Sequence, residues 1–151
     1  MALKERIANE MKAALLGGDR FVGETLRNLK AAILNEEVAT GKREEGLADE
    51  EIEKVVVKEV KKRVESAKLY RDNDRLDLAE PEEQEMEILQ RYLPKQITED
   101  EITAVIEQKA KELNVATLAD MGRLIGAVKS ELGNTADGGT IARIVKQTLG
   151  K

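Results

Sequence analysis

Residues 3–19 read LKERIANEMKAALLGGD, and this stretch decides the fold. Its large apolar residues recur at every fourth position, which places them on one face of an α-helix. These residues are Leu3, Ile7, Met11 and Leu15. Gly17-Gly18 then ends the helix, because glycine adopts the left-handed conformation of a C-cap without steric cost. Asp19 has a side chain that can cap a following helix. The stretch therefore predicts an amphipathic helix with a second helix directly behind it.

Apolar residues recur at intervals of three and four along the rest of the chain as well. This spacing predicts six more helices and no strand. We expect them over about residues 20–40, 49–70, 80–93, 98–113, 117–132 and 138–149. The expected inward faces include Val64 in the third helix and Leu118 in the sixth. Thr98 and Thr117 each stand three residues before an acidic residue, which is typical of a capping box.

Leu93-Pro94 marks a boundary in the middle of the chain, because proline disfavours helix geometry in the residue before it. We therefore predict an all-α fold of two helical subdomains. Residues 1–94 form an N-terminal four-helix region, and residues 95–151 form a C-terminal three-helix bundle. A chain of this length can bury enough apolar surface to fold without disulfides or a structural metal.

The chain contains no cysteine, no histidine and no tryptophan. Thiol catalysis, a structural zinc site and Ser-His-Asp chemistry are therefore excluded. Ser66 and Ser130 lie inside expected helices and outside any nucleophile motif, and no phosphate-binding loop motif occurs. The acidic runs stand mostly at helix starts, where the helix dipole explains them. We predict no catalytic residue, no cofactor and no metal site.

The net charge is -5, from 25 basic and 30 acidic residues, which argues against a generally basic nucleic-acid-binding protein. No apolar run approaches the roughly 18 to 20 residues that span a bilayer. The N-terminal residues become polar too early for a signal peptide. We therefore expect a cytoplasmic protein that does not enter a membrane.

Gly122 and Gly126 interrupt the apolar pattern of the sixth expected helix. In a helix each costs about 1 kcal/mol relative to alanine, so some other interaction must offset the loss. Being four residues apart, the two glycines share one face of the helix. The favoured interpretation is close helix packing inside the subdomain. The alternative is a surface that a large ligand approaches closely.

The last two expected helices are locally basic. From residue 121 onward the basic residues are Arg123, Lys129, Arg143, Lys146 and Lys151, against the acidic residues Glu131 and Asp137. Asp137 and Gly138 form a turn that begins the last helix, and free amides at a helix start favour a phosphate. With two tyrosines and one phenylalanine in the chain, base stacking is not expected. An RNA contact would therefore be to the backbone and shape of a folded RNA.

Several short motifs resemble those of the YqeY-like proteins of the GatB/YqeY family. In the C-terminal part they are Met121-Gly122-x-x-x-Gly126, Ala136-Asp137-Gly138, Ile141 and Ile144-Val145-Lys146. In the N-terminal part they are Leu26-Arg27-x-Leu29-x-Ala31-Ala32-Ile33, Leu78-Ala79-Glu80 and Tyr92-Leu93-Pro94-x-Gln96. Each motif is short, but their order is fairly specific and spans essentially the whole chain. There is one departure: the family often has glycine and a basic residue before Ala-Asp-Gly, where this chain has Asn134-Thr135.

The resemblance implies two helical subdomains, of which the second is similar to the tail domain of the tRNA-dependent amidotransferase B subunit. In that enzyme the tail contacts tRNA. The family-level label of carbon–nitrogen ligase activity, with glutamine as amide donor, also comes with the resemblance. The residues of this chain supply no amidase nucleophile and no ATP site, so the chemistry is not transferred with the fold.

The leading hypothesis is an accessory protein related to glutamine-dependent tRNA amidotransferase that binds folded tRNA and has no catalytic activity of its own. The expected contacts are the cations Arg123, Lys129, Arg143 and Lys146, with Gly122, Gly126, Asp137 and Gly138 forming the backbone of the surface. The alternative is a helical protein–protein adaptor with no RNA role, whose partner is an amidotransferase subunit or another protein. An amide-forming enzyme is the least favoured reading.

Overall fold

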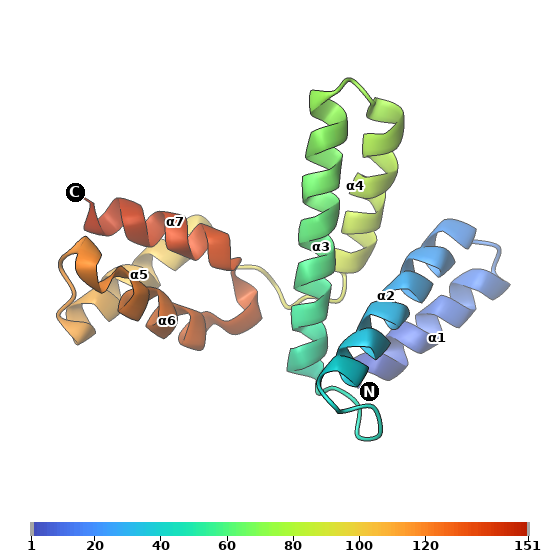
Figure 1. Cartoon of the computed structure of the whole chain (residues 1–151), viewed down its shortest axis with the longest axis horizontal. Coiled ribbons are helices and arrows are strands. Elements are labelled where there is room, and N and C mark those ends of the chain that lie inside the picture. The colour runs from blue at the N-terminus through green and yellow to red at the C-terminus, as the bar shows by residue number, and fades with distance from the viewer. Residues whose placement is uncertain (1, 151) are drawn as a thin grey trace. The chain divides into compact units, whose positions relative to one another are not determined.

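The computed structural model describes residues 2–150, and Met1 and Lys151 lie outside the described part. The described residues form seven α-helices and two short 3₁₀ turns and contain no strand, which confirms the all-α prediction (Figure 1). The elements are α1 (Leu3–Leu16), α2 (Arg20–Ala39), α3 (Asp49–Asp72), α4 (Leu76–Gln90), α5 (Glu99–Leu113), η1 (Leu118–Asp120), α6 (Met121–Leu132), η2 (Gly133–Thr135) and α7 (Gly138–Leu149).

The chain forms two compact units, Met1–Leu93 and Pro94–Lys151. We call them the N-terminal unit, which holds α1 to α4, and the C-terminal unit, which holds α5 to α7. Each unit has its own cluster of buried apolar side chains. Independent folding of the subdomains 1–94 and 95–151 stays a prediction.

The turn between α1 and α2 forms as the sequence predicts. Gly18 adopts a φ of 82°, and Asp19 Oδ1 accepts a hydrogen bond from Val22 N at 3.3 Å. Gly23, in the first turns of α2, lies directly against α1. A Cβ at Gly23 would stand 2.4 Å from Leu15 Cδ2, so the absence of a side chain lets the two helices pack closely.

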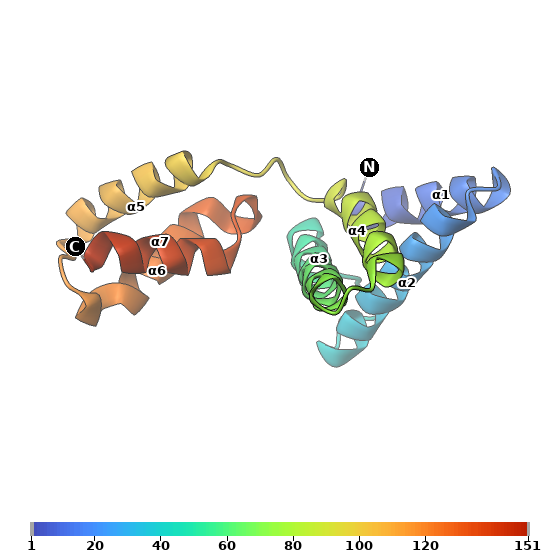
Figure 2. The same cartoon turned by 90° about the horizontal axis from the view of Figure 1, so that it is seen from above.

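The N-terminal unit consists of two helical hairpins, α1–α2 and α3–α4 (Figures 1 and 2). Their shared core contains Ile7, Leu29, Ile52 and Leu89, each at most 1% exposed. Away from this core the hairpins diverge (Figure 1). The expectation that Val64 faces inward is therefore wrong. Val64 is 47% exposed, because α3 extends beyond the region where the two hairpins meet.

The start of α4 also differs from the sequence prediction. The helix begins at Leu76 rather than near Glu80, and Pro81 lies inside it. The carbonyl of Arg75 accepts hydrogen bonds from the amides of Leu78 and Ala79, so the first turn closes before the proline. The Arg75 guanidinium also pairs with Asp77 at 3.1 Å across this turn.

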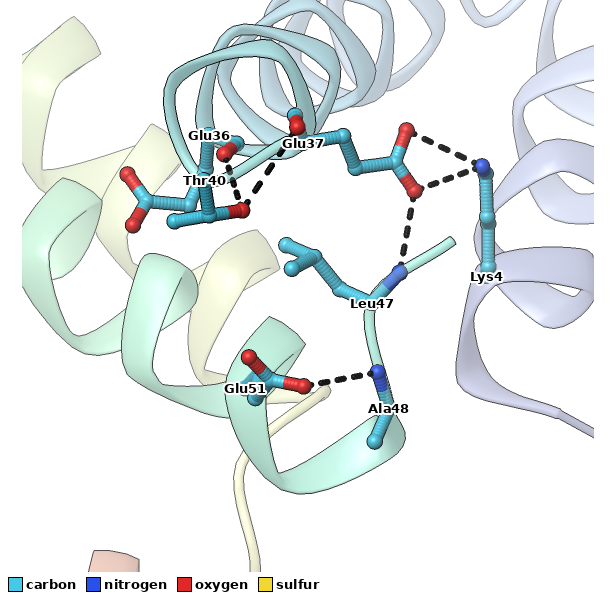
Figure 3. Close-up of polar contacts among 7 residues, drawn as sticks. All are labelled: Lys4, Glu36, Glu37, Thr40, Leu47, Ala48 and Glu51. Atoms are coloured by element: carbon cyan, nitrogen blue, oxygen red, sulfur yellow. Dashed lines mark hydrogen bonds and ion pairs between the residues drawn. The ribbon is translucent and has the colours of Figure 1, made fainter. Parts of the chain in front are cut away.

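Glu37 is a buried carboxylate in the last turn of α2, and Figure 3 shows its polar contacts. It continues the apolar stripe of α2, four residues after Ile33. Glu37 Oε2 accepts from Lys4 Nζ at 2.8 Å and from the amide of Leu47 at 3.1 Å. These bonds tie α2 to the start of α1 and to the loop before α3. The hydrogen bond from Lys4 is the main reason that the pKa of Glu37 is lowered.

The C-terminal unit is a bundle of α5, α6 and α7 (Figure 2). Its core includes Ile106, Leu124, Val128 and Ile141, all 0% exposed. Apolar side chains from all three helices therefore meet in one core, as the spacing of three and four predicts.

The two expected capping boxes form only in part. Thr98 Oγ1 accepts from the amide of Glu101 at 3.2 Å, but the Glu101 carboxylate accepts from the Thr98 hydroxyl instead of its amide. Thr117 makes no side-chain cap, because the 3₁₀ turn η1 comes between it and the start of α6 at Met121. Leu118, expected to face inward, lies in this turn and is 49% exposed.

Candidate nucleic-acid interface

The candidate interface lies on α6 and α7 of the C-terminal unit. The inner sides of these helices carry Leu124, Val128, Ile141 and Val145, which are fully buried. The helices therefore turn their other sides to solvent. All four expected cations are exposed: Arg123, Lys129, Arg143 and Lys146. Lys151, which was counted with them, lies outside the described residues.

Gly122 and Gly126 lie on the exposed side of α6. A Cβ at either position would meet no described atom within 4 Å. The favoured interpretation, close helix packing inside the subdomain, is therefore wrong for the described residues. The helix packs through Leu124 and Val128, on its opposite side. The glycines leave a solvent-facing strip on which the backbone is not covered by side chains.

Lys129 extends this strip toward the start of α7. It lies three residues after Gly126 and so on the same side of α6. A Cβ at Gly138 would stand 3.1 Å from Lys129 Cε and 3.3 Å from Lys129 Nζ. The ammonium group thus lies near the N-terminal end of α7, where the helix dipole is also positive. The Asp137 carboxylate caps the same helix start, so the ammonium and the dipole act there beside one negative charge.

The turn before α7 is fixed by hydrogen bonds. Asp137 Oδ2 accepts from the amide of Thr140 at 3.0 Å and from its hydroxyl at 3.2 Å, which confirms the predicted cap. Gln96 Nε2 donates to the carbonyl of Asn134 at 2.9 Å, and the amide of Ile97 donates to the carbonyl of Thr135 at 3.0 Å. The start of α7 is therefore held in place by the segment that leads into α5.

Two of the four cations already have partners within the unit. Arg123 Nη2 donates to the carbonyl of Leu113 at 3.0 Å and so satisfies a free carbonyl at the end of α5. Arg143 pairs with Glu99 in the first turn of α5. The side chains of Arg143 and Glu99 are 51% and 61% exposed, so water weakens their attraction and a phosphate can compete for the guanidinium.

Lys146 follows Arg143 by three residues and lies on the same exposed side of α7. The structure therefore groups the expected residues in two sets. Lys129 belongs with the glycines of α6 and with Gly138, whereas Arg143 belongs with Lys146. Arg123 lies about 100° around α6 from Gly122, and its hydrogen bond aims it at the end of α5.

The net charge of -5 for the whole chain does not reveal a basic strip on α3. Its members are exposed and recur along one side of the helix: Lys54, Lys58, Lys61, Lys62 and Lys68. We call these residues the α3 lysine strip. Helical spacing of the lysines, rather than the net charge of the chain, is the sequence signal that identifies it.

Residues 2–150 contain no group of three or more acidic side chains arranged to hold a metal ion. Within the same residues, no helix has the length and apolar character needed to cross a membrane.

Comparison with known proteins shows the family to which the chain belongs. The family model described as Yqey-like protein matches residues 4–149. A curated protein of Clavispora lusitaniae (strain ATCC 42720), "Altered inheritance of mitochondria protein 41, mitochondrial", is 30% identical to the chain over 132 residues. That match covers 87% of this chain and 74% of the fungal protein. With nearly its whole length matched by the family model, the chain belongs to the YqeY-like proteins.

Proposed function

We propose that this YqeY-like protein binds folded tRNA through its C-terminal unit and has no catalytic activity of its own. The observation that carries the proposal is the open strip at Gly122 and Gly126, where a Cβ would meet no described atom within 4 Å. Packing within the unit does not account for these helix-weakening residues. A nucleic-acid backbone can approach a helix closely where side chains are missing, and Lys129 beside the strip supplies charge for a phosphate.

The other cations have distinct roles in this proposal. Lys146 and Arg143 meet phosphates from α7, and Arg143 exchanges Glu99 for the nucleic acid. Arg123 acts mainly by holding the end of α5, through its hydrogen bond to Leu113. Contacts of this kind bind the backbone and shape of RNA without reading its bases.

The proposed cellular role is that of an accessory to glutamine-dependent tRNA amidotransferase, with cytoplasmic location. This role rests on the resemblance of the C-terminal motifs to the tail of the amidotransferase B subunit. The fungal relative is by its name a mitochondrial protein. The cytoplasmic location of this chain stays a prediction.

A salt titration of binding to bulk folded tRNA tests the proposed surface. The variant is Arg143→Glu/Lys146→Glu, and the control is Lys12→Glu/Arg20→Glu, which changes the charge equally in the N-terminal unit. Loss of two phosphate contacts lowers the slope of log K against log salt by about 1.5. We expect this loss in the variant and a smaller change in the control.

Lys146→Glu alone leaves the pair of Arg143 with Glu99 intact and is expected to lose about half as much of the slope. Absence of binding at low salt, or equal slopes in variant and control, contradicts the proposal.

An adaptor function is the second candidate, favoured by apolar surface on the α3–α4 hairpin. Val64, Ala67 and Met86 line a groove of about 340 Å³ between these helices. Val64 itself is 47% exposed. Exposed apolar residues of this kind mark protein interaction surfaces when they form a patch. A partner that is captured after nuclease treatment, and lost with Val64→Glu, would support this function.

A further inference from the structure

The α3 lysine strip forms one continuous side of the helix. At about 100° per residue, its five lysines fall within roughly 120° of the helix circumference. Along the axis, Lys54 and Lys68 are separated by about 21 Å, at 1.5 Å per residue. The strip is therefore long enough to follow several successive phosphates of one nucleic-acid strand.

The acidic residues near the strip leave it positive. Glu65 is the one carboxylate between Lys54 and Lys68 that lies on the same side of α3. Glu59 lies at the edge of the strip, where Glu59 Oε1 accepts from Lys62 at 3.2 Å and Glu59 Oε2 accepts from Arg63 at 2.9 Å. Arg63 also pairs with Glu85 at 3.1 Å, so Glu59 and Glu85 together balance Lys62 and Arg63. The other four lysines against Glu65 leave the strip positive. The Lys62 side chain remains 66% exposed in its contact with Glu59.

Beside the strip lies a groove of about 360 Å³ between α2 and α3. Lys58, Glu59 and Lys62 form its α3 wall together with Val55. The α2 wall presents small or uncharged side chains, Ala32, Asn35 and Ala39, and one carboxylate, Glu36. The α3 wall thus carries two lysines and one carboxylate, and the α2 wall carries a hydrogen-bonding amide and one carboxylate.

We propose that the α3 lysine strip and the α2–α3 groove bind the phosphodiester backbone of a folded RNA. This surface lies in the N-terminal unit and is separate from the one proposed on α6 and α7, on which it does not depend. Lys58 and Lys62 bind phosphates, and Asn35 offers an amide for a phosphate or ribose oxygen. No aromatic side chain lines the groove, so the bases are not held by stacking.

The composition of the surface favours RNA over an acidic protein. Protein–protein interfaces are depleted in lysine at their centres and are anchored by aromatic or large apolar residues. Lys58 and Lys62 line this groove together with the carboxylates Glu36 and Glu59, and its largest apolar side chain is Val55, which is 7% exposed and already committed to the core. A phosphate backbone needs positive charge and shape rather than an apolar anchor.

The test is a salt titration of the full-length chain with folded tRNA as the probe. The variant is Lys58→Glu/Lys62→Glu, and the matched control is Lys12→Glu/Arg20→Glu, which removes two exposed cations from the α1–α2 hairpin of the same unit. The variant is expected to lower the slope of log K against log salt by about 1.5 relative to the control. Lys58→Gln/Lys62→Gln adds no repulsion next to Glu59 and is expected to give a similar loss of slope. Far-ultraviolet circular dichroism establishes that each variant keeps its helix content.

A gain of affinity is the second arm. Glu36→Gln removes the one carboxylate of the α2 wall and is expected to tighten tRNA binding about threefold, because a like charge near the phosphate is lost. Equal slopes for variant and control, with no effect of Glu36→Gln, would overturn the proposal. Equally effective competition by polyglutamate at the same charge concentration would also overturn it, in favour of an acidic protein partner.

The two proposed RNA surfaces fail independently in these experiments. Loss of slope in Lys58→Glu/Lys62→Glu, with none in Arg143→Glu/Lys146→Glu, places RNA on the N-terminal unit and contradicts the proposed C-terminal site. The reverse pattern overturns the α3 proposal and leaves the C-terminal site standing. Loss in both variants supports two contact surfaces in one chain.

Discussion

Lys4 Nζ lies 2.8 Å from Glu37 Oε2, and the two side chains are 47% and 2% exposed. The carboxylate is thus buried, while its counter-ion remains at the surface. Removing the two partners should therefore have unequal effects. Lys4→Met leaves a buried charge whose one remaining donor among residues 2–150 is the Leu47 amide, and we expect it to lower the free energy of unfolding by about 2 kcal/mol. Glu37→Gln keeps an acceptor for that amide and should cost about 1 kcal/mol.

Urea unfolding at neutral pH measures this difference. Lys12→Met is the control, because Lys12 is exposed on the same helix. The double variant Lys4→Met/Glu37→Gln should be more stable than Lys4→Met alone, because the unpaired charge is gone. A greater loss in Glu37→Gln than in Lys4→Met would contradict the account of Glu37 as a buried charge that Lys4 neutralises.

The same carboxylate predicts how stability depends on pH. The hydrogen bond from Lys4 holds the pKa of Glu37 below its ordinary value, and a hydrogen bond from Tyr92 does the same for Glu10. A carboxyl group with a lowered pKa binds protons more weakly in the folded than in the unfolded chain. Its contribution is therefore present above the unfolded pKa of about 4.3 and is lost as the pH falls through the folded pKa. The stability difference between the natural chain and Glu37→Gln should thus shrink as the pH falls below about 4, which acid titration of urea midpoints measures.

The helices could be predicted from periodicity, because apolar residues at intervals of three and four mark the face of a helix that a neighbouring element covers. Periodicity did not predict how far that neighbour extends, and so Val64 was placed inward although the hairpins diverge before reaching it. Glu37 was missed for a related reason: a carboxylate in an apolar stripe is explained only by partners from α1 and the loop before α3, 33 and 10 residues away. The glycines of α6 were identified from sequence, but whether they face a neighbour or solvent depends on the fold.

Gly126 and Gly23 should respond oppositely to substitution by alanine. A Cβ at Gly126 meets no described atom within 4 Å, so Gly126→Ala should raise the free energy of unfolding by up to about 1 kcal/mol through helix propensity. A Cβ at Gly23 would stand 2.4 Å from Leu15 Cδ2, so Gly23→Ala should lower it by about 1 kcal/mol despite the same propensity gain. If Gly126 serves RNA contact, the stabilised Gly126→Ala variant should bind folded tRNA more weakly. Destabilisation by Gly126→Ala would show that the glycine has a packing role instead.

The two units should fold independently. Each has its own buried cluster, and the boundary falls between Leu93 and Pro94. We expect separate chains of residues 1–93 and 94–151 to be helical and to unfold cooperatively, as judged by circular dichroism during thermal unfolding. The C-terminal chain is short, so its midpoint should be the lower of the two. A C-terminal chain that becomes helical only when the N-terminal chain is added would contradict this prediction.

Thr135→Lys should increase RNA binding if the start of α7 meets a phosphate. Asn134-Thr135 stands where YqeY-like proteins often carry glycine and a basic residue, so this chain lacks one positive charge there. The backbone at Thr135 is held by the hydrogen bond from Ile97 to its carbonyl, which a side-chain substitution leaves in place. The Thr135 hydroxyl donates to the carbonyl of Leu132 at 2.6 Å, so the loss of this bond should lower stability slightly.

One added phosphate contact should steepen the salt slope of tRNA binding by about 0.7 to 0.9. Thr135→Gln loses the same hydroxyl without adding charge and is the control. Equal slopes for the lysine and glutamine variants would place the RNA away from this turn, even if Lys146 proved to contact it.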